Sequence, residues 1–216
     1  MSEPRTPQQA RADLAEWRSA VPEDLARIDE HLAAANRRYL TGDRLAAVTE
    51  AAEALVREVP GRLATLVDRY QAHPPRHEKY DGIGNLVEEV VFDGDYHLAG
   101  EVVWGSGLLH WAGEPGRSFE QANLFALASL EGEMGHMCAA TCTTGLVRVL
   151  RWAGAGDLLD RFGSGLCSAG YAAALRGAQY LTEVQGGSDV GANAVAAREA
   201  GDGTFLIDGE KWFCSV

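Results

Sequence analysis

The fold of this chain is decided by residues 181–191, which are Leu181-Thr182-Glu183-Val184-Gln185-Gly186-Gly187-Ser188-Asp189-Val190-Gly191. The adjacent glycines, flanked by hydroxyl and carboxyl side chains, predict a turn between a helix and a strand. Such a loop can present backbone N–H groups and the hydroxyls of Thr182 and Ser188 to an anionic or carbonyl-rich ligand. An ordinary connection between a helix and a strand explains the same composition equally well, because a Gly-Gly-Ser loop is a weak motif.

Downstream of this loop the hydrophobic pattern alternates, which predicts β-strands. We expect three strands, at residues 194–200, 204–207 and 210–215. Gly201-Asp202-Gly203 joins the first two, and the hairpin signal Asp208-Gly209 joins the second and third. The sequence stops at Val216 with nothing to pair the last strand, an arrangement that is poorly stable alone. We therefore expect an unfinished β domain that another polypeptide completes.

Upstream of the loop the apolar residues recur with helical spacing. A first helix is predicted to begin at the capping box Thr6-Pro7-Gln8-Gln9 and a second at Pro22. Asp43 is expected to cap a third helix, whose apolar stripe ends at Pro60-Gly61. A fourth, shorter helix is predicted to follow, with Leu63, Leu66, Val67 and Tyr70. Such stripes indicate core packing rather than a cofactor site.

Two further helical regions are predicted before the loop. Residues 83–104 alternate apolar and acidic positions, and we expect two short helices there. A capping box at Ser118 begins the longest predicted helix, which runs to about Ala153. Small residues in its middle predict a central helix that a neighbour approaches closely, and Cys138 and Cys142 on one face indicate packing rather than a metal or redox site.

Composition argues against several classes of function. The 19 Lys and Arg residues against 31 Asp and Glu residues give a net charge of −12, which argues against nucleic-acid binding. No apolar run approaches the roughly 18 residues of a membrane helix, and no secretory signal is visible. Four cysteines among small and apolar residues fit reduced thiols, so we expect a cytoplasmic protein. Between His73 and His77, two prolines prevent the helical turn that would aim both imidazoles at one metal ion.

Two motifs in order carry a resemblance to a known family. The loop from Thr182 to Asp189 resembles the Thr-Glu-x-x-x-Gly-Ser-Asp loop of the acyl-CoA dehydrogenase superfamily, and Asp208-Gly209-Glu210-Lys211-Trp212-Phe213-Cys214-Ser215 resembles its flavin-contacting hairpin. The details are most similar to the AidB-like branch. The resemblance implies an α+β fold, in which an all-α N-terminal helical domain (residues 1–178) precedes the first strands of an antiparallel middle β domain (residues 179–216).

The resemblance also implies a cofactor and a reaction. It indicates an FAD-dependent oxidoreductase that acts on CH–CH groups, in the α,β-dehydrogenation of an acyl-CoA or related acyl thioester. The positions that match the family's cofactor contacts are Leu181, Thr182, Gly187, Ser188, Phe213 and Ser215. The family places the first two at the flavin ring, the glycine and Ser188 near the ribityl-diphosphate, Phe213 on the isoalloxazine and Ser215 near flavin N5. For Glu183 we expect a structural role, in ordering the loop.

The same resemblance places the catalytic base in a C-terminal helical bundle, so it implies no catalytic residue in this chain. We therefore expect the N-terminal subunit of a heteromeric complex, in which a second polypeptide supplies the rest of the β domain and the bundle, within a larger homo- or hetero-oligomer. Two alternatives stay open. One is a flavin-dependent oxygenase or oxidase of the same fold in secondary metabolism, and the other is a non-catalytic fragment or binding module.

Overall fold

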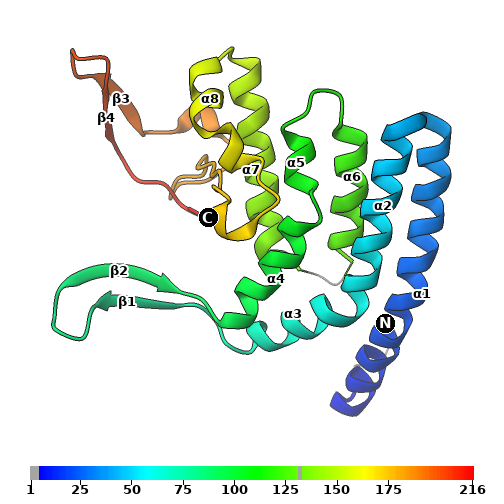
Figure 1. The fold of residues 1–216 in the computed structure, drawn as a ribbon. Helices are drawn as coiled ribbons and strands as arrows, with labels where there is room; N and C mark the ends of the chain where they lie inside the picture. The colour runs from blue at the N-terminus through cyan, green and yellow to red at the C-terminus, as the bar shows by residue number, and fades with distance from the viewer. Residues whose placement is uncertain (1–4, 131–132) are drawn as a thin grey trace.

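Helices make up most of the structure, which is a computed structural model. It describes residues 5–130 and 133–216, except for the side chains of residues 21–27. Figure 1 shows the helices side by side in one body, from which two β-hairpins project. The helices are α1 (Pro7–Tyr39), α2 (Gly42–Glu58), the π-helical η1 (Val59–Leu63), α3 (Ala64–Gln71), α4 (Gly94–Gly105), α5 (Leu108–Ala112), α6 (Ser118–Ala128), α7 (Gly135–Trp152), α8 (Gly156–Leu166) and the short 3-10 turns η2 (Tyr171–Ala173) and η3 (Val190–Ala192). The strands are β1 (Arg76–Tyr80), β2 (Leu86–Val91), β3 (Ala196–Glu199) and β4 (Phe205–Asp208). This mostly helical structure with a few antiparallel strands confirms the α+β fold class that the sequence predicts.

One apolar cluster forms the core of the helical body. It joins α2, η1, α3, α4, α5, α6 and α7, and the largest fully buried side chains include Trp104, Leu108 and Leu124. The stripe predicted on α2 lies in this core, since Val48 and Leu55 are buried there. Burial of such side chains supplies most of the favourable free energy of folding, at roughly 25 cal/mol per Å² of apolar surface. In the described part of the chain, no helix is long and apolar enough to cross a membrane.

A buried ion pair ties α2 to the start of α6. The Glu120 carboxylate is fully buried and accepts hydrogen bonds from Arg44 Nε at 2.7 Å and Nη2 at 2.8 Å. Arg117 Nη1 donates to it at 3.0 Å. Burial alone would raise the pKa of Glu120, but the bonds from the two arginines outweigh it and hold the pKa below its ordinary value. The charge is thus neutralised and fully hydrogen-bonded, as a buried carboxylate requires.

The first helix begins as predicted, whereas Pro22 does not begin a second one. Thr6 Oγ1 accepts from Gln9 N at 3.2 Å, and Gln9 Oε1 accepts in return from Thr6 N at 2.8 Å, so the capping box is present. The backbone of α1 continues unbroken through Pro22. The third predicted helix ends close to Pro60-Gly61, since α2 ends at Glu58, and the π-helical turn η1 leads into α3, which is the fourth predicted helix. A wider π turn changes the hydrogen-bond register where proline lacks its N–H.

Two predicted caps were wrong. Thr41, not Asp43, is the N-cap residue of α2, and it makes no side-chain cap bond. Ser118 starts α6 without a capping bond, and the predicted single helix to Ala153 is two helices, because α6 ends at Ala128 and α7 begins at Gly135. The Gln121 amide, expected in the capping box, instead donates to Leu108 O at 3.1 Å and to Thr144 Oγ1 at 2.9 Å.

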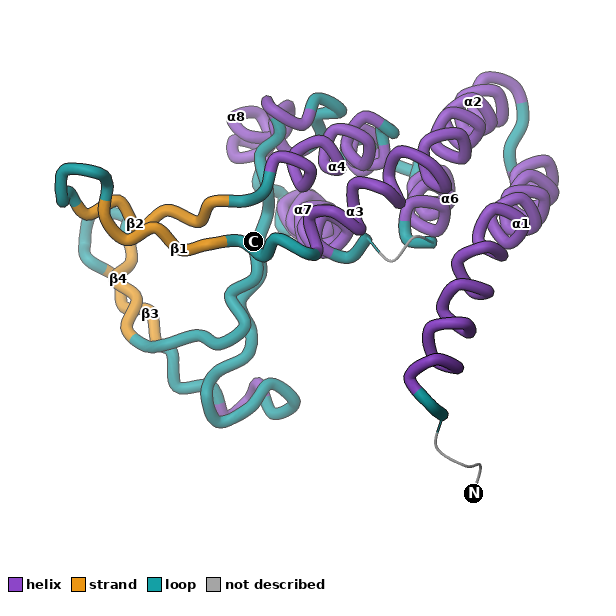
Figure 2. The backbone as a smooth tube through the Cα atoms, turned by 90° about the horizontal axis from the view of Figure 1, so that it is seen from below, coloured by secondary structure: helices purple, strands orange, loops and turns teal. Residues whose placement is uncertain are grey.

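The hairpin of β1 and β2 was not predicted, and it replaces the first of the two helices expected in residues 83–104. The strands pair antiparallel, with Arg76 opposite Val91 and Tyr80 opposite Leu86. Residues 86–91 carry apolar pairs four positions apart, a spacing that suits a helix, and the structure places them in a strand instead. The helix α4 begins only after Asp93, whose carboxylate accepts from Asp95 N at 2.8 Å. Figure 2 shows this hairpin extending away from the helices.

The second hairpin confirms two of the three strands predicted after the loop. β3 and β4 pair antiparallel through the predicted glycine turn, in which Gly201 and Gly203 adopt φ of +90° and +82°. Residues 210–215 are not a strand in the structure. The chain turns back at Gly209, where an added Cβ would lie 2.5 Å from Val195 Cγ2, and crosses the loop of residues 181–191 instead.

The packing of α4 against η2 depends on one glycine. A Cβ built on Gly100 would lie 2.2 Å from Cε2 of Tyr171. We expect Gly100→Ala to lower the free energy of unfolding by about 1–3 kcal/mol, because the Tyr171 ring must move. On the same helix, Gly105 has open space around it, and Gly105→Ala should change stability by less than about 1 kcal/mol. Urea unfolding of both variants measures the difference, and equal effects would contradict this packing.

Candidate functional site

The residues predicted to contact a cofactor lie on two segments that cross each other. The first is the Gly-Gly-Ser loop, residues 181–191, and the second is the C-terminal segment, residues 209–216. Trp212 N donates to Thr182 O at 2.8 Å, which fixes the crossing point. Lys211 Nζ reaches the neighbouring carbonyl of Leu181 at 3.3 Å. The structure therefore joins residues about thirty positions apart in sequence.

The Glu183 carboxylate organises this crossing. It is 3% exposed and accepts hydrogen bonds from the backbone N–H of Ala194 at 2.6 Å and of Val195 at 3.1 Å. Gln185 Nε2 donates to it at 2.7 Å, and Lys211 Nζ at 2.8 Å. Four donors from the loop, the start of β3 and the C-terminal segment thus meet at one side chain.

These donors hold the Glu183 carboxylate in its ionised form. The hydrogen bond from Lys211 has the largest effect, followed by that of Ala194 N, and together the donors lower the pKa of Glu183 to about 2. A carboxylate with so low a pKa is a poor proton acceptor at neutral pH. The geometry supports the structural role expected for Glu183 from the sequence.

The loop leaves Leu181, Gly187 and Ser188 exposed, whereas Thr182 is half-buried. The Leu181 side chain is 62% exposed, while its carbonyl accepts from Asn193 Nδ2 at 2.9 Å. In the described part of the chain the Thr182 hydroxyl makes no hydrogen bond. A Cβ on Gly187 would lie 2.6 Å from Thr182 Oγ1, so only glycine lets the loop close onto that hydroxyl. Ser188 is exposed on the same loop.

On the C-terminal segment, Phe213 and Ser215 are also exposed. The Phe213 side chain is 74% exposed, and its backbone has a φ of +56°, which is uncommon outside glycine. Its ring lies 6.0 Å from that of Trp212, edge to face. Ser215 lines a cavity, together with Val216. The structure brings Leu181, Thr182 and the C-terminal segment together.

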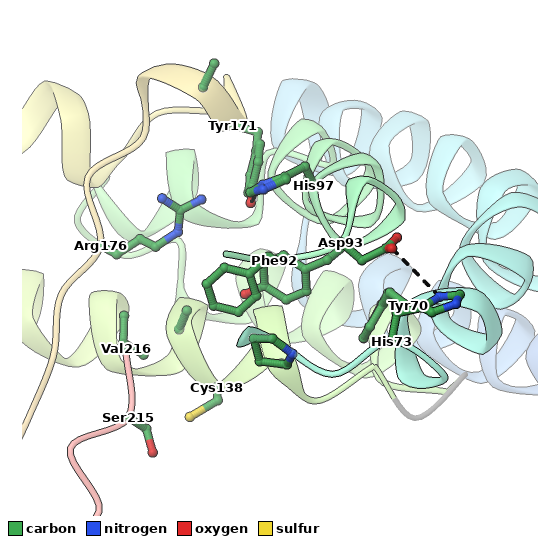
Figure 3. A pocket seen from close by; sticks show the side chains of 15 residues that line it. Tyr70, His73, Phe92, Asp93, His97, Cys138, Tyr171, Arg176, Ser215 and Val216 are labelled. Carbon is green, nitrogen blue, oxygen red and sulfur yellow. Dashed lines mark hydrogen bonds and ion pairs between the residues drawn. The ribbon is translucent and has the colours of Figure 1, made fainter. Parts of the chain in front are cut away.

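That cavity was missed by the sequence analysis. It has a volume of about 740 Å³ and lies between α3, α4, α7, η2 and the C-terminal segment. Figure 3 shows side chains from all of these elements pointing into it. Its walls are mainly aromatic and apolar, and the residues that shape them include Tyr70, Phe92, Tyr96, His97, Tyr171 and Arg176. Because these residues come from distant parts of the chain, no local motif marks them.

The wall on α4 is built on stacked rings. The Tyr96 ring stacks on Phe92 with centroids 4.4 Å apart and on His136 with centroids 4.0 Å apart. His136 Nε2 lies 2.7 Å from Tyr96 O, which can only accept, so this nitrogen carries the proton. Burial lowers the pKa of His136, which favours the neutral ring. Burial also raises the pKa of Tyr96 to about 12, so this ring is uncharged at neutral pH.

A second buried carboxylate, Glu133, fixes the other wall. It lies before the first turn of α7 and accepts from the backbone N–H of His136 at 2.9 Å and of Met137 at 3.1 Å. The Tyr70 hydroxyl donates to the same carboxylate at 2.7 Å. Burial and this bond raise the pKa of Tyr70 above its ordinary value. The carboxylate therefore satisfies the free N–H groups of α7 and anchors a cavity residue of α3.

The histidines considered as metal ligands have separate partners. His73 Nδ1 lies 3.7 Å from Asp93, whereas His77 Nε2 lies 2.9 Å from Glu88 on β2. Across the described ranges, no three His, Cys, Asp or Glu side chains are grouped so as to hold a metal ion. The four cysteines are free thiols.

Comparisons with known proteins agree on one family. Residues 18–173 match the model of the Adaptive response protein AidB N-terminal domain. The putative acyl-CoA dehydrogenase AidB of Escherichia coli (strain K12) is 32% identical over 168 residues, which cover 72% of this chain and 30% of that protein. The chain thus spans about a third of the length of this curated relative.

Two solved structures have a similar fold. Caenorhabditis elegans ACDH-11 in complex with C11-CoA has a TM-score of 0.71 at 23% identity, over 84% of this chain and 32% of that one. The apo-form of Bd2924 has a TM-score of 0.69 at 21% identity, over 98% of this chain and 40% of that one. At this level of identity the likeness concerns the fold.

The bonds to Glu183 predict how the loop responds to pH. The pKa of this carboxylate is depressed in the folded chain, so its contribution to stability is complete above its ordinary pKa of 4.5 and is lost as the pH falls toward about 2. We expect the amides of Ala194 and Val195 to exchange with solvent about tenfold faster in Glu183→Gln at neutral pH. Hydrogen exchange measured by NMR tests this.

Glu210 provides the matched control for this variant. It is an exposed glutamate on the neighbouring C-terminal segment. Glu210→Gln removes the same charge and should leave both amides unchanged. Equal exchange in the two variants would show that Glu183 does not order the loop.

Proposed function

This chain belongs to the AidB N-terminal domain family of acyl-CoA dehydrogenase-like proteins, and on that basis we propose that it forms the N-terminal part of an FAD-dependent oxidoreductase that dehydrogenates an acyl thioester. One observation carries the proposal. Glu183 ties together the two segments that match the family's flavin contacts, and the end of the second segment, Ser215 and Val216, lines a cavity of about 740 Å³. Ligand sites in proteins commonly have volumes of about 300–1,000 Å³.

The exposed groups of the crossing fit a flavin. The Thr182 hydroxyl, with no hydrogen bond to any described residue, is proposed to bind the polar edge of the ring, and Leu181 and Phe213 to cover its apolar surface. Gly187 and Ser188 are proposed to face the ribityl-diphosphate, because glycine lets the backbone approach phosphate closely. Ser215 is proposed to lie near N5. In this chemistry FAD supplies the hydride acceptor.

The cavity is proposed to take the acyl group. It borders Ser215, so an acyl chain in it would lie beside the proposed flavin position. Its rings exclude water from that chain, which favours transfer of a hydride over side reactions. The structure of ACDH-11 was determined in complex with C11-CoA, and this fold therefore accommodates an acyl-CoA in at least one protein.

We assign no catalytic base to this chain. Its two buried carboxylates near the site, Glu183 and Glu133, are each saturated by hydrogen bonds from the protein. The base is proposed to come from the C-terminal helical bundle of the family. That a second polypeptide supplies this bundle, within a larger oligomer, stays a prediction, as does a domain boundary after residue 178.

Flavin binding tests the proposal. We expect the complete protein, purified from its source, to be yellow with bound oxidised flavin. Thr182→Val and Ser215→Ala should each weaken FAD binding by about tenfold, because each removes one hydrogen-bonding hydroxyl. Ser164→Ala, on the exposed face of α8, is the matched control and should bind FAD normally. Titration of the apoprotein with FAD, followed by absorbance, gives the dissociation constants.

Intact mass measured on the same material tests the second polypeptide. A stoichiometric partner chain in the yellow fraction is the expected result. A colourless, monodisperse protein that takes up no FAD would overturn the proposed function.

A further inference from the structure

We propose that Arg176 is an anion-recognition residue of the cavity, and that the acyl group bound there carries a second, free carboxylate. This inference rests on the proposed function, because it names the substrate class of that same site. The substrates would then be half-thioesters of dicarboxylic acids rather than plain fatty acyl thioesters.

The first observation is where the Arg176 charge lies. Among the described residues that line the cavity, Arg176 is the only lysine or arginine. Figure 3 shows its side chain on the same wall as Tyr171 and His97, with Ser215 and Val216 on the neighbouring segment. Arg176 is itself exposed, but the cavity surface around it is mainly aromatic and apolar, so solvent screens its charge less than that of an arginine surrounded by water.

The second observation is that Arg176 has no carboxylate partner among the described residues. Other arginines close to buried parts of the body are paired, such as Arg44 and Arg117 with Glu120. No ion pair within 4.0 Å joins Arg176 to any described acidic side chain, although the chain has 31 Asp and Glu residues. The one carboxylate lining the cavity, that of Asp93, is engaged instead by Asp95 N at 2.8 Å and approached by His73 at 3.7 Å.

The third observation is that aromatic rings hold the guanidinium in place. Its Cζ lies 4.7 Å from the ring centroid of Tyr171 and 5.3 Å from that of Trp104. Trp104 is fully buried, and the Tyr171 hydroxyl lies 3.0 Å from His97 Nδ1, so both rings are fixed. A guanidinium held over two rings in this way still has N–H groups that can bind a carboxylate, even where one of them is shared with the Tyr171 hydroxyl. Tyr171 is therefore a positioning residue for Arg176.

The chemistry of the whole cavity then selects the ligand. The rings of Phe92 and Tyr96 can contact the apolar part of a ligand, and Arg176 can bind one carboxylate of that ligand. A neutral acyl chain of the same length would leave Arg176 without an anion in a site from which water has been removed, and that loss disfavours it. Discrimination therefore comes from charge as well as from size.

The test uses two probes that need neither flavin nor turnover. Monomethyl adipate has a free carboxylate, and its ester stands in for the thioester, whereas dimethyl adipate is its neutral counterpart. We expect the complete protein to bind monomethyl adipate at least about tenfold more tightly, measured by ligand-observed NMR titration. Arg176→Met should abolish this preference and leave the affinity for dimethyl adipate unchanged, and Arg176→Lys should keep part of it.

Arg161→Met is the matched control. The Arg161 guanidinium also lies over an aromatic ring, 4.8 Å from the centroid of Phe162, but it is outside the cavity. The preference for the carboxylate should survive in this variant. Urea unfolding of all three variants checks that they are folded.

The outcomes separate the two proposals. Equal binding of the two probes, no binding of either, or a preference that persists in Arg176→Met overturns the role of Arg176, whatever the flavin content. A colourless protein that takes up no FAD but prefers monomethyl adipate through Arg176 overturns the proposed oxidoreductase and supports the anion site.

Discussion

The candidate site depends on one buried carboxylate. Glu183 takes donors from its own loop, from the start of β3 and from Lys211, and so ties together segments that the sequence separates. Burying a charge is costly unless it is paired and fully hydrogen-bonded, and here both conditions are met. The Gly-Gly-Ser loop, the turn at Gly209 and the return of the C-terminal segment all follow from that requirement. The side chains left facing outward are those that the family resemblance assigns to a flavin.

The helical body serves the site by building the cavity wall. Glu133 satisfies the first N–H groups of α7 and anchors Tyr70, while Gly100 lets Tyr171 lie directly on α4. Stacking of Tyr96 on Phe92 and His136 holds these rings in place. Two of the chain's buried acids thus act in the same way, by collecting N–H and O–H donors, and neither is free to move a proton.

The sequence predicts those features that depend on neighbouring residues. The Thr6 capping box, the apolar stripe of α2, the glycine turn between β3 and β4 and the loop at residues 181–191 were all predicted from local pattern. The predictions of secondary structure were wrong where the local sequence pattern is compatible with more than one structure. The apolar pairs in residues 86–91 have helical spacing but lie in a strand, and residues 210–215 have strand composition but contact the loop rather than pair with β4. The cavity could not be predicted from the sequence, because its lining residues meet only through tertiary packing. They include Tyr70, Tyr96, Tyr171 and Ser215.

The central claim is that the Glu183 crossing forms the flavin-contacting surface. A crystal structure of the complete protein with FAD bound measures this most directly. We predict the isoalloxazine ring against Leu181, Thr182 and Ser215, with Lys211 still bonded to Glu183. FAD bound elsewhere on the protein, or a crossing in which Lys211 has left Glu183, would contradict this account.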